Sequence, residues 1–432
     1  MLPILNQSIW RDEAFTLLLS EKSPLEIIKL TIQDTSPPLH YLILHYWMIV
    51  FGNSEVSSRG LSFLFHSLTA LTVFFIARKL VKNTTIQILI SITVLLNPFL
   101  LQYAFEARSY SLLAFLTTLA VYLALSRRNL LTGIVLTLAI FTHNFAIFSY
   151  IAFLAWFIYV HKHTIRTEIG EFLKFAILPS VAILSWENVL YTQWTKVASD
   201  FWIKQTTSST FIHSFEQYTR GDIYYPIQPM LYTITLILCL FAFSYWVWKQ
   251  KEEDEKALSL IFFVAVVPLL VTYVISALFA PIYHERYLIG TAPMLAILVG
   301  HSLYKLYLNN EKVRKLLIGF VAIYLVLLVQ SSEQIVSTTT KPAINYGVNQ
   351  VLSKATEGDI IIPEDQLNFL EVKYYVKRSG SGIPVYAYNP SGKIPFYLGA
   401  VMFEPQDIIR SYPENSKVWK IKADGGYNLI NQ

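Results

Sequence analysis

Long apolar segments separated by short polar junctions are the feature that most constrains what this sequence can fold into. A helix needs about 20 apolar residues to cross a bilayer, because lipid offers no partner for an unpaired backbone group. Hydrophobic residues make up 54% of the chain and charged residues 15%, against about 25% charged in soluble domains. We therefore predict an all-α polytopic membrane protein with spans at residues 56–80, 84–103, 107–126, 130–141, 144–160, 172–191, 229–248, 257–280, 287–304 and 316–330.

Lysine and arginine gather at every second junction between these spans. The basic junctions contain Arg78, Lys79 and Lys82; Arg127 and Arg128; Lys162 and Arg166; Lys249, Lys251 and Lys256; and Lys305, Lys312, Arg314 and Lys315. Short cytoplasmic loops are enriched in these residues, so we place these junctions in the cytoplasm of a multi-pass cell-membrane protein. The alternating junctions, which include Asn97-Pro98, 192–228 and 281–285, are then expected outside.

Two places depart from a regular series of spans. Residues 1–55 are expected outside although no span precedes them, and their first residues lack the basic start, apolar core and cleavage site of a signal peptide. Either this terminus crosses unaided, or an amino-terminal helix precedes Met1. The short span 130–141 is followed by His143 and Asn144, which predict a re-entrant bend or a polar lining that faces protein or a cavity.

The chain is expected to divide into two domains. Residues 1–331 form the membrane domain, in which the first outer loop, 1–55, carries interfacial helices at 25–32 and 40–50. Residues 332–432 have a soluble-like density of charge and predict a small α/β domain outside the membrane, with a helix at 344–355 and strands at 359–363, 383–388 and 418–421. The lone Cys239 excludes a disulfide framework, and a net charge of +5 is too small to imply a nucleic-acid partner.

The first outer loop holds the densest group of polar residues. Asp12 and Glu13 follow Trp10-Arg11, and Asp34 precedes a Ser-Pro-Pro sequence. One interpretation is that these carboxylates are presented at the rim of the helix bundle as a site. The other is structural: Asp12 caps a helix that begins at Glu13, and Ser-Pro-Pro is a turn. The residue types leave both open.

Further charged and polar residues lie inside or beside the spans. An ionisable group within a membrane costs about 2.5–3.5 kcal/mol on insertion scales, so it marks a functional site by default. Two of them have a structural alternative: Arg59 could extend to the interface, and His143 could be a hydrogen-bonded packing residue. The candidates for substrate binding are Asp34, Arg59, Glu106, Arg108, His143, His284, Arg286 and Tyr287.

Carboxylates and cations gathered on one membrane face suit glycosyl transfer. A carboxylate can take the proton from an acceptor hydroxyl as it attacks a sugar carbon, and cations or a metal would stabilise a lipid phosphate as it leaves. One carboxylate suffices for inversion, whereas retention usually needs a second as nucleophile. A divalent cation would suit oxygen ligands such as Asp12, Glu13, Asp34 and Glu106, and the need for one stays open.

Several short motifs follow one another in a fixed order. They are Trp-x-Asp-Glu-Ala-x-Thr at 10–16, Asp-x-Ser-Pro-Pro-Leu-x-Tyr at 34–41, Phe-Gly-x-Ser-Glu at 51–55 with Arg59 and Ser62, Glu-Ala-Arg-x-Tyr at 106–110, Thr142-His143-Asn144, Phe201-Trp202-Ile203 and Glu285-Arg286-Tyr287-Leu288. Together they resemble the polyprenyl-phosphate-dependent GT-C glycosyltransferases. The sequence is most similar to the family 39/83-like group, which contains protein O-mannosyltransferases and aminoarabinose–lipid A transferases.

The resemblance implies an inverting glycosyltransferase that takes a sugar from a dolichyl- or undecaprenyl-phosphate donor on the outer face of the membrane. It implies that Asp12 is the general base, with Glu13 beside it. Glu13, Asp34 and Glu106 would shape the acceptor or metal site, and Arg108, His143 and Arg286 would hold the donor phosphate. The acceptor could be a lipid, a glycan or a protein.

The alternative is a transporter or flippase of a lipid-linked saccharide. Such folds often contain internal repeats and helices broken at the bilayer midplane. No repeat is visible, and the charges gather near the outer edge, so the sequence favours the enzyme.

Overall fold

The computed structural model describes residues 3–199, 203, 205–221, 228–248, 255–309, 311–413 and 416–430. The predicted motif residues Phe201 and Trp202 and the junction residues Lys249 and Lys251 lie outside this description. The chain forms two compact units. Unit 1 contains Met1–Leu61, Glu106–Arg108 and Ser337–Gln432, and unit 2 contains Ser62–Phe105 and Ser109–Val336. The division at residue 331 stays a prediction about how the chain folds.

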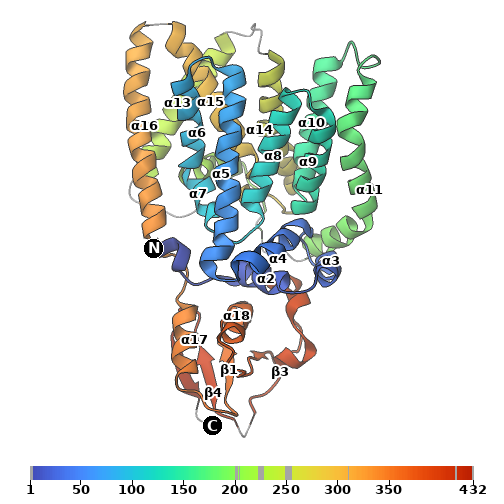
Figure 1. Cartoon of the computed structure of the whole chain (residues 1–432), viewed down its shortest axis with the longest axis vertical. Helices are drawn as coiled ribbons and strands as arrows, with labels where there is room; N and C mark the ends of the chain where they lie inside the picture. The colour runs from blue at the N-terminus through green and yellow to red at the C-terminus, as the bar shows by residue number, and fades with distance from the viewer. Residues whose placement is uncertain are drawn as a thin grey trace. The chain divides into compact units, whose positions relative to one another are not determined.

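Unit 2 is a bundle of helices (Figure 1). Each predicted span falls on helical segments, which confirms a polytopic helical membrane protein. The helices are α5 (Glu55–Leu80, shared with unit 1), α6 (Thr84–Leu95), α7 (Pro98–Ala104), α8 (Tyr110–Leu125), α9 (Asn129–Thr142), α10 (Ala146–His161), α11 (Ile169–Ser199), α12 (Thr210–Arg220), α13 (Gln228–Trp248), α14 (Glu255–Leu278), the 3-10 turn η1 (Glu285–Leu288), α15 (Thr291–Asn309) and α16 (Glu311–Ser337).

Length and hydropathy single out four of the described helices as able to cross a membrane by themselves: Glu55–Leu80, Ile169–Val197, Lys256–Leu278 and Glu311–Ser337. The pair α6 and α7 forms a fifth candidate, with a bend of 58° between its helices. The span expected at 84–103 is therefore formed by two helices with a bend between them. Pro98 has no N–H with which to continue α6, and the Asn97 side chain accepts the Leu100 N–H at 2.9 Å, which starts a new helix.

The break at His143 is a turn between helices. α9 ends at Thr142, His143 is extended, and α10 begins at Ala146. Close packing on this side of the bundle depends on Gly133 of α9, where a Cβ atom would lie 2.9 Å from the carbonyl oxygen of Phe175 on α11. α8, α9 and α11 consequently pack in succession, while α10, α14, α15 and α13 form a second series of neighbours (Figure 1).

Unit 1 begins with short helices that surround the predicted carboxylates. They are α1 (Pro3–Asn6), α2 (Arg11–Ser20), α3 (Pro24–Gln33) and α4 (Leu39–Phe51), and the last two confirm the expected interfacial helices as helices. α2 starts at Arg11, with Trp10 as its N-cap residue. The expectation that Asp12 caps a helix from Glu13 is therefore wrong, because Asp12 lies within the first turn.

The tail contributes a small α/β fold to unit 1. Its helices are α17 (Ile344–Leu352) and α18 (Phe369–Ser379), and one sheet has the order β1-β4-β5. In that sheet β1 (Ile360–Pro363) is parallel to β4 (Val418–Ile421), which pairs antiparallel with β5 (Tyr427–Ile430). A second, parallel pair joins β2 (Ala387–Tyr388) and β3 (Ile408–Ile409). The predicted strand at 383–388 is thus shorter than expected, and α18 and β5 were not predicted.

α18 packs against α2 inside unit 1. The Tyr375 hydroxyl accepts the Ile9 N–H at 2.8 Å, just before α2 begins. Farther along, Lys377 on α18 pairs with Glu21 at the end of α2, at 2.5 Å. The helix that carries Asp12 is therefore fixed from the tail at both of its ends.

Candidate functional site

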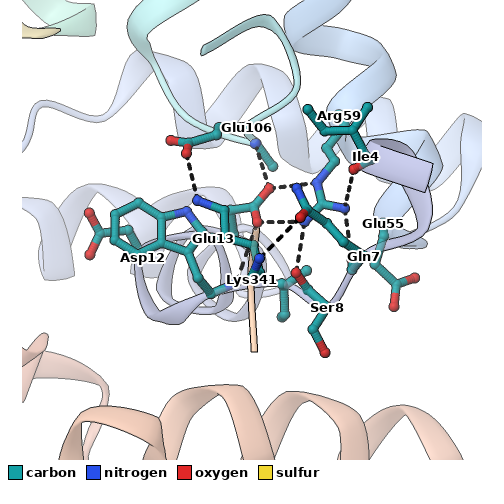
Figure 2. Close-up of polar contacts among 12 residues, drawn as sticks. Ile4, Gln7, Ser8, Asp12, Glu13, Glu55, Arg59, Glu106 and Lys341 are labelled. Atoms are coloured by element: carbon teal, nitrogen blue, oxygen red, sulfur yellow. Dashed lines mark hydrogen bonds and ion pairs between the residues drawn. The ribbon is translucent and has the colours of Figure 1, made fainter. Parts of the chain in front are cut away.

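A buried ion pair organises the first outer segment. Arg59 forms two hydrogen bonds with the Glu13 carboxylate, from Nε to Oε1 at 2.9 Å and from Nη2 to Oε2 at 2.7 Å. Both side chains have 0% exposure. Glu13 also accepts the backbone N–H of Ala107 at 2.9 Å and that of Trp10 at 3.4 Å, so the pair links α2, α5 and the 106–108 segment (Figure 2).

Arg59 uses its remaining N–H groups on backbone carbonyls. Nη1 donates to the carbonyl oxygens of Ile4, Leu5 and Gln7 at 3.2, 3.0 and 2.8 Å, and Nη2 donates to that of Ser8 at 3.1 Å. These carbonyls lie at and after the end of α1, which leaves such groups without helical partners. The alternative that Arg59 extends to the membrane interface is wrong, because its side chain is fully buried. Its contacts assign this guanidinium to holding α1 rather than to a substrate.

The electrostatics of Glu13 agree with a fixed ion pair. Burial by itself would raise the pKa of Glu13, but the charge and hydrogen bonds of Arg59 lower it below the ordinary value, with help from Lys341 and the Ala107 backbone. Glu13 is thus held as a carboxylate whose oxygens face its partners. This geometry fixes the Glu13 side chain in place next to Asp12.

Asp12 has a different environment from its neighbour. Its side chain is 25% exposed, and its carboxylate lies 3.8 Å from Arg108 Nη2 and 3.7 Å from Arg11 Nε. Figure 2 shows the Asp12 and Glu13 carboxylates pointing in different directions from α2. Arg108 also donates from Nη1 to the Asp12 carbonyl oxygen at 3.2 Å and to Thr16 Oγ1 at 3.0 Å. The structure therefore places an accessible carboxylate beside a cation that is itself anchored.

Glu106 is joined to the tail. Lys341 Nζ lies 2.7 Å from Glu106 Oε1 (Figure 2). It also lies 4.3 Å from the ring centre of Trp10. Within the described part of the chain, the buried Oε2 atom of Glu106 has no hydrogen-bond partner. Lys341 was not a predicted site residue, because it lies 235 positions from Glu106 in the sequence.

We expect Lys341→Met to lower the free energy of unfolding by about 1–3 kcal/mol, because it leaves a buried carboxylate without its cation. Thermal unfolding of the detergent-solubilised protein measures this loss. Lys354→Met is the matched control, since Lys354 is exposed and its ammonium group donates to the Tyr427 hydroxyl at 2.5 Å. Equal stability of the two variants would contradict a structural role for the Lys341–Glu106 pair.

Asp34 lies close enough to Tyr41 for its charge to act on the Tyr41 hydroxyl, as do the charges of Asp12 and Arg108. Burial, together with the charges of Asp34 and Asp12, raises the pKa of Tyr41 to about 12, although Arg108 and a hydrogen bond with Ser36 oppose this. Next to it, burial and the Arg108 charge lower the pKa of His40 to about 3. Arg108 is therefore bordered by a neutral imidazole and a protonated phenol, with carboxylates around them.

A second cluster forms in unit 2 from residues that the sequence singled out. The Tyr287 ring centre lies 5.0 Å from that of His143 and 5.3 Å from that of His284. The Arg286 guanidinium carbon lies 5.4 Å from the Tyr287 ring centre and 5.6 Å from that of Tyr110. Cations over aromatic faces are attracted by the ring quadrupole, so this arrangement concentrates positive charge among aromatic rings.

Glu285 anchors this cluster to α12. Ser214 Oγ donates to Glu285 Oε1 at 3.0 Å and shares a 2.9 Å hydrogen bond with the Tyr283 hydroxyl, and the carboxyl group is 7% exposed. Its other oxygen, Oε2, lies 3.7 Å from His284 Nδ1. Ser214 and Tyr283 were not predicted, since nothing in the local sequence links α12 to η1.

The predicted carboxylates do not converge as metal ligands. Among the described residues, no group of three or more His, Cys, Asp or Glu side chains could hold a metal ion. Glu13 is occupied by Arg59 and Glu106 by Lys341. The arrangement of Asp12, Glu13, Asp34 and Glu106 therefore does not fit a shared cation.

A GT-C fold, which the motifs predict, is confirmed by a family model and by solved structures that match the chain. A family model described as dolichyl-phosphate-mannose-protein mannosyltransferase matches residues 35–186. This stretch runs from the Ser-Pro-Pro sequence into α11 and contains Arg59, Glu106, Arg108 and His143. No curated protein sequence matches the chain.

Solved structures with the same fold cover most of the chain. ArnT from Cupriavidus metallidurans in the apo state is 11% identical with a TM-score of 0.63, covering 96% of this chain and 89% of that one. The same protein bound to undecaprenyl phosphate is 14% identical with a TM-score of 0.60, covering 97% of this chain and 89% of that one. The Archaeoglobus fulgidus oligosaccharyltransferase in complex with Zn and sulfate is 10% identical with a TM-score of 0.53. The match covers 85% of this chain and 58% of that one. At these identities the likeness establishes the fold.

Proposed function

We propose that this protein is an inverting glycosyltransferase that moves a sugar from a polyprenyl-phosphate donor to an acceptor hydroxyl on the outer face of the membrane. The observation that carries the proposal is the contrast between Asp12 and Glu13. Glu13 is closed inside an ion pair with Arg59, whereas Asp12, the next residue along α2, is partly exposed and faces Arg108. An accessible carboxylate on a fixed helix is what a general base requires.

Asp12 would remove the proton from the acceptor hydroxyl as its oxygen forms a bond to the anomeric carbon. The bond between that carbon and the donor phosphate breaks on the opposite face, and the phosphate leaves with the electron pair. One carboxylate is sufficient for such a displacement. The buried Oε2 atom of Glu106 offers a hydrogen-bond acceptor in the same unit, which suits orientation of a hydroxyl.

The aromatic and cationic cluster of unit 2 would bind the donor phosphate. Arg286 supplies a planar set of N–H donors that matches phosphate oxygens, and its stacking on Tyr110 and Tyr287 restricts its orientation. The undecaprenyl phosphate in the ArnT structure supports a ligand of this chemical class. The experiment below identifies the sugar and the class of acceptor, whether lipid, glycan or protein.

The direct test incubates membranes that contain the protein with a panel of radiolabelled polyprenyl-phosphate sugars and follows the label into lipid, glycan and protein fractions. We expect label transfer from at least one donor, with inverted anomeric configuration in the product. Movement of intact labelled donor between leaflets without transfer would instead support a flippase. Absence of both results would contradict the proposed function.

We expect Arg286→Met to weaken binding of polyprenyl phosphate by about 10- to 100-fold, because a charge-assisted hydrogen bond contributes about 1.5–3 kcal/mol. Titration of the detergent-solubilised protein with a fluorescent short-chain polyprenyl phosphate measures the dissociation constant. Arg314→Met is the control, since Arg314 also lies against a tyrosine ring, that of Tyr307, at 5.1 Å. Unchanged affinity in Arg286→Met would remove this residue from the donor site.

A further inference from the structure

A buried carboxyl group of the tail reaches the first turn of α2, directly beside Asp12. Glu371 lies on α18 and is 4% exposed. Asn368 Nδ2 donates to its Oε2 at 2.5 Å, and the backbone of Arg11 forms a second hydrogen bond with the carboxyl group. Arg11 is the first residue of α2, where backbone N–H groups have no partner within the helix. Glu371 therefore satisfies a donor of the helix that carries Asp12.

Charged groups of α2 face Glu371 as well. The Arg11 guanidinium attracts its carboxylate and lies 3.7 Å from Asp12, while the charge of Glu13 acts against it. Arg11 thus connects Glu371 to Asp12 in two ways. Its backbone binds Glu371 directly before Asp12 in the sequence, and its guanidinium interacts with both carboxylates. On α18 itself, Lys373 is held by Asp407 at 2.6 Å.

The rest of α18 keeps its position without Glu371. Tyr375 binds the Ile9 N–H at 2.8 Å, and the Tyr374 hydroxyl donates to the Asn53 carbonyl oxygen at 2.7 Å. We therefore expect a change at Glu371 to act at the start of α2. There a negative charge is favoured by the helix dipole, so removal of the charge loosens the first turn.

We propose that Glu371 is a positioning residue for the transfer reaction: its carboxylate fixes Arg11 and the first turn of α2, and thereby sets the direction of the Asp12 carboxylate. It acts through α2 and contacts none of the reacting atoms. The inference rests on the proposed function, in which Asp12 is the base. It assigns to the tail a part in orienting the general base, exerted through α2.

A pH dependence follows from the burial of this group. Burial raises the pKa of Glu371 to about 7, although the hydrogen bonds from Asn368 and the Arg11 backbone and the Arg11 charge lower it. The carboxylate, which is the form that holds α2, is present above this value. The hydrogen bonds from Asn368 and the Arg11 backbone favour the carboxylate, so this contact with α2 weakens as the pH falls through about 7, whereas burial favours the neutral acid.

The test compares transfer rates of the full-length protein and the Glu371→Gln variant between pH 5.5 and 8.5. The glutamine keeps the shape and is neutral throughout, so we expect a rate about two- to fivefold below wild type at pH 8 and a similar rate at low pH. The donor KM should stay the same. Glu364→Gln is the matched control, because Glu364 is an exposed tail carboxylate that pairs with Lys420.

A second measurement is independent of activity. Hydrogen exchange of the amides of residues 11–13 should slow in the wild type as the pH rises through about 7, after correction for intrinsic exchange, and should not do so in Glu371→Gln. Superimposable pH–rate profiles of the variant and wild type would overturn the inference, as would exchange without this transition. If no donor supports transfer, the proposed function fails, while the exchange result still decides whether Glu371 fixes α2.

Discussion

Replacing Arg59 with methionine is expected to lower the free energy of unfolding by about 3–5 kcal/mol, because it leaves the buried Glu13 carboxylate without its partner. The two side chains are fully buried, so solvent cannot take the place of the guanidinium. The same change releases the carbonyl groups of Ile4, Leu5, Gln7 and Ser8, which Arg59 binds at the end of α1. Chemical or thermal unfolding in a mild detergent measures the difference.

Two further variants make this result specific. Arg78→Met removes an exposed arginine from the other end of the same helix and should change stability by less than about 0.5 kcal/mol. The double variant Glu13→Gln with Arg59→Met should regain part of the loss, since no unpaired charge remains. Wild-type stability of Arg59→Met would contradict the closed ion pair.

Asp12→Asn is expected to reduce the rate of sugar transfer by about 10²–10⁴-fold, the usual contribution of a general base. The amide has nearly the shape of the carboxylate but cannot accept the proton of the acceptor hydroxyl. Asp12 is also 25% exposed, so its neutralisation should leave folding and donor binding nearly intact. Single-turnover transfer from the active labelled donor, with the donor dissociation constant measured in parallel, separates the chemical step from binding.

The matched control for this variant is Asp365→Asn in the tail. Asp365 accepts the Leu367 N–H as the cap of a short 3-10 turn, a role that asparagine fills equally well. It should retain wild-type transfer. Full activity of Asp12→Asn, with an unchanged unfolding temperature, would show that another group is the base.

The helices of unit 2 could be predicted because apolar runs of span length leave few alternatives. The motifs also indicated which residues gather, since His143, His284, Arg286 and Tyr287 meet in one cluster. The pairing of Glu106 with Lys341 could not be foreseen, because a contact across 235 positions leaves no local pattern.

Two other parts of unit 1 show why local reasoning was insufficient. α18 is rich in tyrosine and valine, residue types that favour strands, and its helical form depends on packing against α2. The sequence allows Asp12 as a cap because aspartate is common at that position. The helix instead begins at Arg11, and the Glu13 side chain accepts the Trp10 N–H at 3.4 Å.

The composition of unit 1 has a consequence for exchanging parts between related proteins. Its interior is built from the amino-terminal 61 residues, three residues at 106–108 and the carboxy-terminal stretch from Ser337. In a chimera that takes only its tail from a relative, the foreign tail would have to pack against the native Trp10, Glu106 and α2. The packing of unit 1 is therefore kept in a chimera only when both ends of the chain and the 106–108 segment are exchanged together.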